Sequence, residues 1–131
     1  MHHALRIFAL TLAAGLALAA LAHAGPLEDA ARESGKPLIV RFGLERCLQC
    51  IRQGQAFDAL EPTVRGEMTF RFVHIGREEE MAGQYGVLLV PTVLFFDRAG
   101  SEMFRHVGYL DPAQLEAQLR KAGLLGAAAG G

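Results

Sequence analysis

The sequence has no tryptophan, only two cysteines among its 131 residues, and a formal charge of only −1. Two cysteines cannot build the disulfide-dense scaffold of many small secreted domains. A near-neutral chain lacks the positive charge that drives non-specific binding to nucleic acid, so we expect no nucleic-acid partner. The length suits one domain with a buried core, and no internal repeat divides the chain.

The first 24 residues contain no acidic residue, and 18 of them are apolar. The stretch 7–21 has one polar residue, and Ala22-His23-Ala24 supplies the small residues that a signal peptidase accepts. This pattern predicts a signal peptide over residues 1–24. The alternative is an uncleaved membrane anchor, but the apolar stretch is shorter than the roughly 20 residues that span a bilayer. We therefore expect an exported protein, located in a bacterial periplasm, where cysteines can be oxidised.

After the leader, apolar periodicity and turn residues predict alternating helices and strands. We expect helices at 26–34, 47–60, 78–84 and from Asp111-Pro112 to Gly123, and strands at 38–42, 69–75, 92–96 and 102–107. This order predicts one α/β domain with a mixed sheet over residues 25–125, followed by a disordered tail at 126–131. We assign five phenylalanines to the core: Phe42, Phe70, Phe72, Phe95 and Phe96.

The main chemical motif is Cys47-Leu48-Gln49-Cys50, at the junction of a loop and a helix. The first turn of a helix has unpaired N–H groups and partial positive charge, which lower the pKa of a thiol placed there. Cys47 is therefore the candidate attacking thiol. Cys50, one turn further on, is the candidate resolving thiol, which releases the partner from a mixed disulfide. The nearby cations Arg46 and Arg41 are candidates for stabilising the thiolate.

Three other interpretations of the cysteine pair remain. A structural disulfide is one, although a bridge across four residues stabilises a fold only slightly. A zinc site needs more ligands, and His74 and His106 do not stand at paired spacing. A Cu(I) carrier needs only two thiolates.

Several further motifs follow the cysteine pair in a fixed order. Val90-Pro91-Thr92 comes some forty residues later, and 94–97 (LFFD) and 108–110 (GYL) follow it. Together with the strand at 38–42, these motifs resemble the thioredoxin family, and the resemblance covers nearly all of residues 36–124. Within that family, the stretch from 95 to 111 is similar to the periplasmic reductase branch.

The resemblance implies a thioredoxin-like fold, a central mixed four-stranded sheet flanked by helices. It also implies an enzyme, a protein thiol–disulfide oxidoreductase that needs no cofactor beyond the Cys47–Cys50 disulfide. We favour the reductase direction, but oxidases and isomerases share this fold, so the sequence leaves the direction open. Pro91 is then cis, and Val90, Pro91 and Thr92 frame the substrate groove. Expected partners are proteins with disulfides or thiols, with a membrane disulfide reductase as electron donor, and we expect a monomer. The alternative is a non-catalytic binding module of the same fold or a Cu(I) carrier.

The sequence departs from the family beside the cysteine pair. Arg46 replaces the usual tryptophan, and Arg41 replaces a buried aspartate that accepts a proton from the resolving cysteine. Water or Glu45 would then have to accept that proton. We expect Arg41 to stabilise a thiolate instead, which would favour the reduced protein.

Overall fold

The computed structural model describes residues 24–64 and 66–126 and contains eight helices and strands in this range. In chain order they are α2 (Pro26–Ser34), β1 (Leu38–Gly43), α3 (Leu48–Val64), β2 (Thr69–His74), α4 (Glu79–Gln84), β3 (Thr92–Phe96), β4 (Glu102–Val107) and α5 (Pro112–Lys121). The strands form one sheet in the order β2-β1-β3-β4. Strands β1 and β2 are parallel and the other two pairs are antiparallel, so the expected mixed four-stranded sheet is confirmed.

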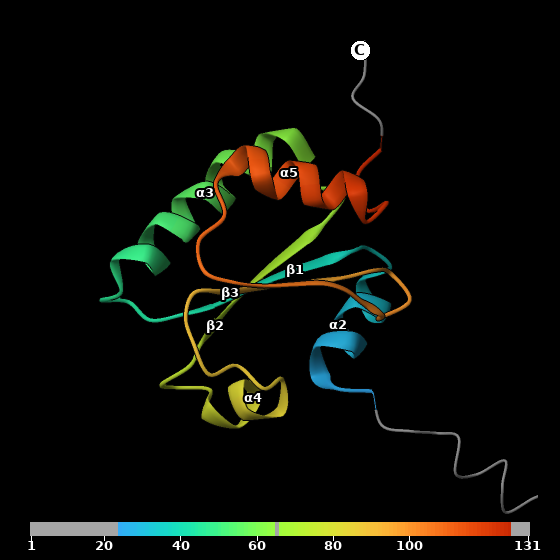
Figure 1. Cartoon of the computed structure of the whole chain (residues 1–131). Helices are drawn as coiled ribbons and strands as arrows, with labels where there is room; N and C mark the ends of the chain where they lie inside the picture. The colour runs from blue at the N-terminus through green and yellow to red at the C-terminus, as the bar shows by residue number, and fades with distance from the viewer. Residues whose placement is uncertain (1–23, 65, 127–131) are drawn as a thin grey trace, which may run out of the picture.

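Helices cover both faces of this sheet (Figure 1). Helices α3 and α5 lie on one face, where Ile39, Val93 and Phe95 pack against them. Helices α2 and α4 lie on the other face, against alternate residues of the same strands, among them Val40 and Leu94. Because strands β1 and β3 are covered on both sides, they consist almost entirely of buried residues.

Local sequence features set the ends of two helices as expected. The Asp111 side chain accepts from the Gln114 N–H, and the Gln114 side chain accepts in return from the Asp111 N–H. This capping box, with Pro112 as the first helical residue, starts α5. Helix α2 ends at Gly35, whose φ of 64° is readily adopted by glycine.

Two sequence-based expectations were wrong. The helix predicted to end at residue 60 continues through Pro62 to Val64, because Val64 is fully buried in the same apolar cluster as Leu60 and this packing outweighs the backbone hydrogen bond that proline cannot make. Phe72, expected in the core, is 37% exposed. It lies on β2, which is an edge strand, and the Arg41 guanidinium covers its ring.

The predicted leader lies almost entirely outside the described residues, as does the predicted tail beyond residue 126. The structure therefore leaves both as predictions. Among the helices at residues 24–64 and 66–126, none is long and apolar enough to cross a membrane.

Tyr85 joins the N-terminal helix to the rest of the domain. Its hydroxyl donates to Glu28 Oε2 and accepts from the Leu27 N–H at 2.9 Å. Its ring packs beside Phe42 and Phe96. Burial, together with the hydrogen bond to Glu28, raises the pKa of Tyr85 to about 12.

We expect Tyr85→Phe to lower the free energy of unfolding by about 2 kcal/mol at neutral pH, because the buried Leu27 N–H loses its acceptor. The folded state holds the phenolic proton more tightly than the unfolded chain, whose tyrosine pKa is about 10. This stabilisation is therefore complete below pH 10 and is lost as the pH rises toward about 12. Urea unfolding at pH 8 and pH 11 measures both effects.

Tyr109→Phe is the control, since its hydroxyl has no hydrogen-bond partner among the described residues. If Tyr85→Phe and wild type lose equal stability between the two pH values, the assigned role is wrong.

Candidate active site

The two cysteines form a disulfide at the N-terminus of α3. The Cys47 carbonyl accepts from the Ile51 N–H at 3.0 Å, which makes Cys47 the residue that caps the helix. The Cys47 Sγ accepts from the Cys50 N–H at 3.2 Å. The sulfur thus occupies the place of an N-cap oxygen. In the reduced protein, a thiolate at this position is stabilised by that N–H and by the positive end of the helix.

The two sulfur-bearing residues differ in exposure. Cys47 is partly exposed, whereas Cys50 is only 2% exposed and lies against Gly43. A Cβ built on Gly43 would lie 3.2 Å from Cys50 Cβ and 3.3 Å from its Sγ, so any larger residue there would crowd the disulfide. Of the two residues, Cys47 is therefore the more accessible to a disulfide of another protein.

The segment 90–92 lies at the same end of the sheet. The Val90–Pro91 peptide bond is cis, as the family resemblance implied. Thr92 pairs with Phe42 across the antiparallel β1–β3 ladder, and the next step of this register places Pro91 opposite Gly43. Gly43 in turn packs against Cys50, so this register places Pro91 at the end of the sheet that carries the disulfide. The Thr92 hydroxyl donates to the Leu89 carbonyl at 2.6 Å and ties down the preceding loop.

The two arginines proposed to stabilise a thiolate lie in different surroundings. Arg46 is exposed and forms no ion pair with any other described residue. Arg41 is half-buried, with its guanidinium 4.1 Å above the centre of the Phe72 ring. Burial lowers the pKa of Arg41, and the nearby Asp58 charge partly opposes this shift.

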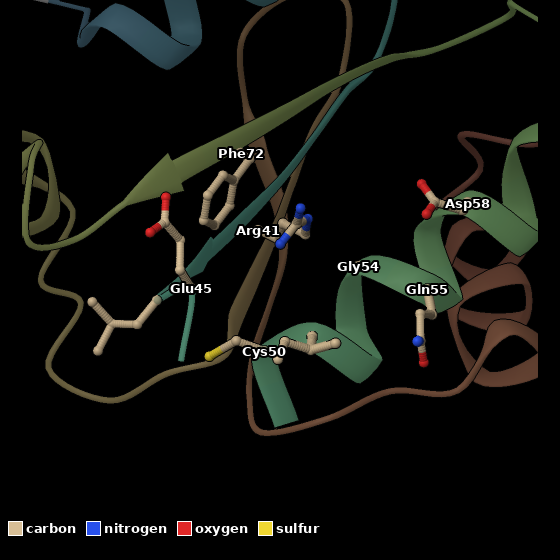
Figure 2. Close-up of a pocket in the computed structure, with 9 residues that line it drawn as sticks. Arg41, Glu45, Cys50, Gly54, Gln55, Asp58 and Phe72 are labelled. Atoms are coloured by element: carbon tan, nitrogen blue, oxygen red, sulfur yellow. The ribbon is translucent and has the colours of Figure 1, made fainter. Parts of the chain in front are cut away.

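Arg41 and Cys50 line one pocket of about 320 Å³ beneath the first turns of α3 (Figure 2). The residues lining it are Arg41, Leu44, Glu45, Cys50, Ile51, Gly54, Gln55, Asp58 and Phe72. The structure therefore brings Arg41 into the surroundings of the resolving cysteine. Glu45, the candidate proton acceptor, is paired with Arg77 at 2.7 Å.

The sequence interpretation missed Gln53. This side chain is fully buried, donates to the Leu110 carbonyl at 3.0 Å and accepts from the Leu110 N–H at 2.8 Å. It thereby fastens the turn of α3 that follows Cys50 to the segment before α5. One feature could have revealed it: Gln53 stands three residues after Cys50 and three before Ala56, which is the spacing of buried positions on a helix.

No group of three or more His, Cys, Asp or Glu side chains suited to a metal ion occurs within residues 24–64 and 66–126. His74 and His106 lie on β2 and β4, at the two edges of the sheet, and are not brought together. The disulfide sulfurs remain the candidate soft-metal ligands once they are reduced.

The sequence matches a known protein family. The family model described as a thioredoxin-like domain covers residues 28–123, most of the chain. The chain belongs to the thioredoxin family. The mitochondrial thioredoxins of Mus musculus and Bos taurus are each 32% identical to it over 98 residues, which is 74% of this chain and 58% of each relative. This thioredoxin-family chain therefore spans somewhat more than half the length of these relatives.

Solved structures agree on the fold. A thioredoxin from Fasciola hepatica superposes with a TM-score of 0.63 at 28% identity, covering 72% of this chain and 89% of that one. The structure described as thioredoxin-2, a component of malaria parasite protein secretion machinery, gives a TM-score of 0.63 at 19% identity, over 66% of this chain and 82% of that one. At that identity the second match supports the fold alone.

Proposed function

We propose that this thioredoxin-family chain is an exported thiol–disulfide oxidoreductase in which Cys47 attacks and Cys50 resolves. The observation that carries the proposal is the asymmetry of the pair. Cys47 is partly exposed and its sulfur accepts a hydrogen bond from the Cys50 N–H at the start of α3, whereas Cys50 is buried. Family membership supports the same chemistry.

The reaction proceeds in two exchanges. The Cys47 thiolate attacks one sulfur of a partner disulfide, a mixed disulfide forms, and the other partner sulfur leaves as a thiolate that takes up a proton. The Cys50 thiolate then attacks Cys47 Sγ, and the bond between Cys47 and the partner breaks. Two electrons have passed to the partner, which leaves with two thiols. The Cys47–Cys50 disulfide of the structure is the oxidised product of this cycle.

The substrate surface that we propose combines Val90, Pro91 and Thr92 with apolar side chains beside them. Leu88 and Leu89 are 90% and 65% exposed, and they border a hollow of about 220 Å³ that Thr92 also lines. Exposed leucines in the loop that leads to the cis peptide bond offer apolar contacts to a segment of a protein substrate. The backbone at Val90 can pair with that segment as a short added strand.

Replacing Leu88 and Leu89 together by serine should lower kcat/KM for insulin reduction about tenfold, because two partial leucine contacts with the substrate are lost. The rate of exchange with dithiothreitol should not change, since this small reagent can react with the disulfide without contacting Leu88 or Leu89. The exposed Met103→Ser variant on β4 is the control. An equal loss toward both reagents would show that the substitution altered the disulfide chemistry rather than docking.

The cellular setting is part of the proposal. The apolar leader at 1–24 supports export, and a periplasmic location would place the protein among oxidised partners. We propose the reductase direction, with electrons supplied by a membrane disulfide reductase, and a monomeric protein.

Reduction of insulin by dithiothreitol tests the activity directly. Catalytic amounts of the protein should accelerate insulin precipitation over the buffer control. No acceleration, together with copper that remains bound to the reduced protein through desalting, would favour the alternative of a Cu(I)-binding module.

A further inference from the structure

Five residues of α3 line the pocket, and three of them follow one another along one side of the helix. These are Cys50, Gly54 and Asp58, which are spaced four apart. The Arg41 guanidinium lies against the middle one. A Cβ built on Gly54 would lie 3.3 Å from both Cζ and Nη2 of Arg41, so a larger residue there would require the guanidinium to shift by a few tenths of an ångström.

This position sets the guanidinium between the turn that carries Cys50 and the turn that carries Asp58 (Figure 2). Phe72 closes the other side, with its ring 4.1 Å from Arg41 Cζ. No carboxylate among the described residues lies within ion-pair distance of the guanidinium. Its positive charge is therefore not neutralised by direct contact and acts on the other groups of the pocket.

The charged groups around Cys50 come from every element packed near it. Strand β1 supplies Arg41, helix α3 supplies Asp58, and the loop before α3 supplies Glu45 and the disulfide partner Cys47. The Glu45 carboxylate is paired with Arg77, and Asp58 lies two helical turns from Cys50. Strand β2 contributes the uncharged Phe72, with the His74 ring 6.1 Å beyond it. Neither Arg41 nor Asp58 forms an ion pair among the described residues, so the guanidinium is the unpaired positive charge of this set and Asp58 the unpaired negative charge.

We propose that Arg41 is a positioning residue that acts through Cys50, by stabilising the Cys50 thiolate in the reduced protein. This rests on the proposed thiol–disulfide exchange. The resolving thiol then ionises to water without a carboxylate acting as base, and its thiolate attacks Cys47 Sγ as the partner sulfur leaves. Because a charge that stabilises the thiolate stabilises the reduced form, Arg41 also makes the Cys47–Cys50 disulfide easier to reduce.

The test is the equilibrium between the protein disulfide and dithiothreitol, measured for wild type and for Arg41→Met, which keeps the apolar stem but removes the charge. We expect the equilibrium constant for reduction of the protein to fall about tenfold, which corresponds to about 30 mV. Arg41→Lys should retain most of the wild-type value. Asp58→Asn should shift it a few-fold in the opposite direction, because it removes the charge that opposes the guanidinium.

A second readout separates electrostatics from structure. In the Cys47→Ser background, the ultraviolet absorbance of the Cys50 thiolate against pH should have a midpoint about one unit higher when Arg41→Met is added. Unchanged midpoints and equilibrium constants in folded Arg41→Met would overturn the inference, even if the wild type still reduces insulin. If Arg41→Met does not fold, the exposed Asp58→Asn variant decides, and an unchanged equilibrium constant there overturns the inference. A wild-type protein that exchanges with neither dithiothreitol nor insulin would instead overturn the proposed function.

Discussion

Cys47→Ser is expected to reduce the rate of insulin reduction to that of the buffer control, a loss of at least about a thousandfold. Cys47 is the more exposed member of the pair, and its sulfur accepts a hydrogen bond from the Cys50 N–H at the start of α3. A serine hydroxyl stays protonated at neutral pH. The helix terminus then has no anion to stabilise, and the variant has no nucleophile to attack a disulfide. The rate of insulin precipitation under dithiothreitol measures the loss.

The matched variant is Cys50→Ser, which keeps the attacking thiol. It should still form a mixed disulfide with insulin in a single turnover, but the intermediate should persist until dithiothreitol releases it. Both variants lose the same disulfide, so any loss of stability is shared and cancels in the comparison. A Cys47→Ser protein that forms mixed disulfides through Cys50 as fast as Cys50→Ser forms them through Cys47 would reverse the assigned roles.

Gln53→Leu should lower the free energy of unfolding by about 3 kcal/mol. The leucine fills a similar volume, but it leaves both the N–H and the carbonyl of Leu110 buried without their partner. The loss also frees the segment before α5 from the helix that carries the disulfide. Denaturant unfolding monitored by circular dichroism measures the effect.

The control is Gln55→Leu, the same exchange at an exposed position of the same helix, which should change stability by less than about 0.5 kcal/mol. If Gln53→Leu and Gln55→Leu cost the same, the two hydrogen bonds to Leu110 do not contribute to stability as described.

Much of the fold followed from local sequence features. The strands at 38–42, 69–75, 92–96 and 102–107 were placed to within one residue, because alternation and buried apolar runs are strong where a sheet is covered. Asp111, Pro112 and Gln114 located the start of α5 through their capping chemistry. The cis bond at Pro91 followed only from the family resemblance, since most proline bonds are trans.

The remaining features depend on tertiary contacts. Helix α3 continues past Pro62 to Val64 because burial of the Val64 side chain in the core stabilises the last turn. Phe72 is partly exposed because β2 is an edge strand, and strand order does not follow from the pattern of one strand. The place of Arg41 in the pocket that Cys50 also lines depends on the packing of β1 against α3 and on Gly54, one turn after Cys50, against which the guanidinium lies. The role of Gln53 depends on two hydrogen bonds to the backbone of Leu110, which lies 57 residues further along the chain.

The most direct measurement of the central claim is the mass of the Cys50→Ser protein after it has been reduced, freed of reductant and mixed with insulin. The account predicts an adduct of one insulin chain, which peptide mapping places on Cys47 and which dithiothreitol removes. A folded Cys50→Ser protein that gives no disulfide-linked adduct under these conditions would contradict the claim that Cys47 is the nucleophile of a thiol–disulfide oxidoreductase.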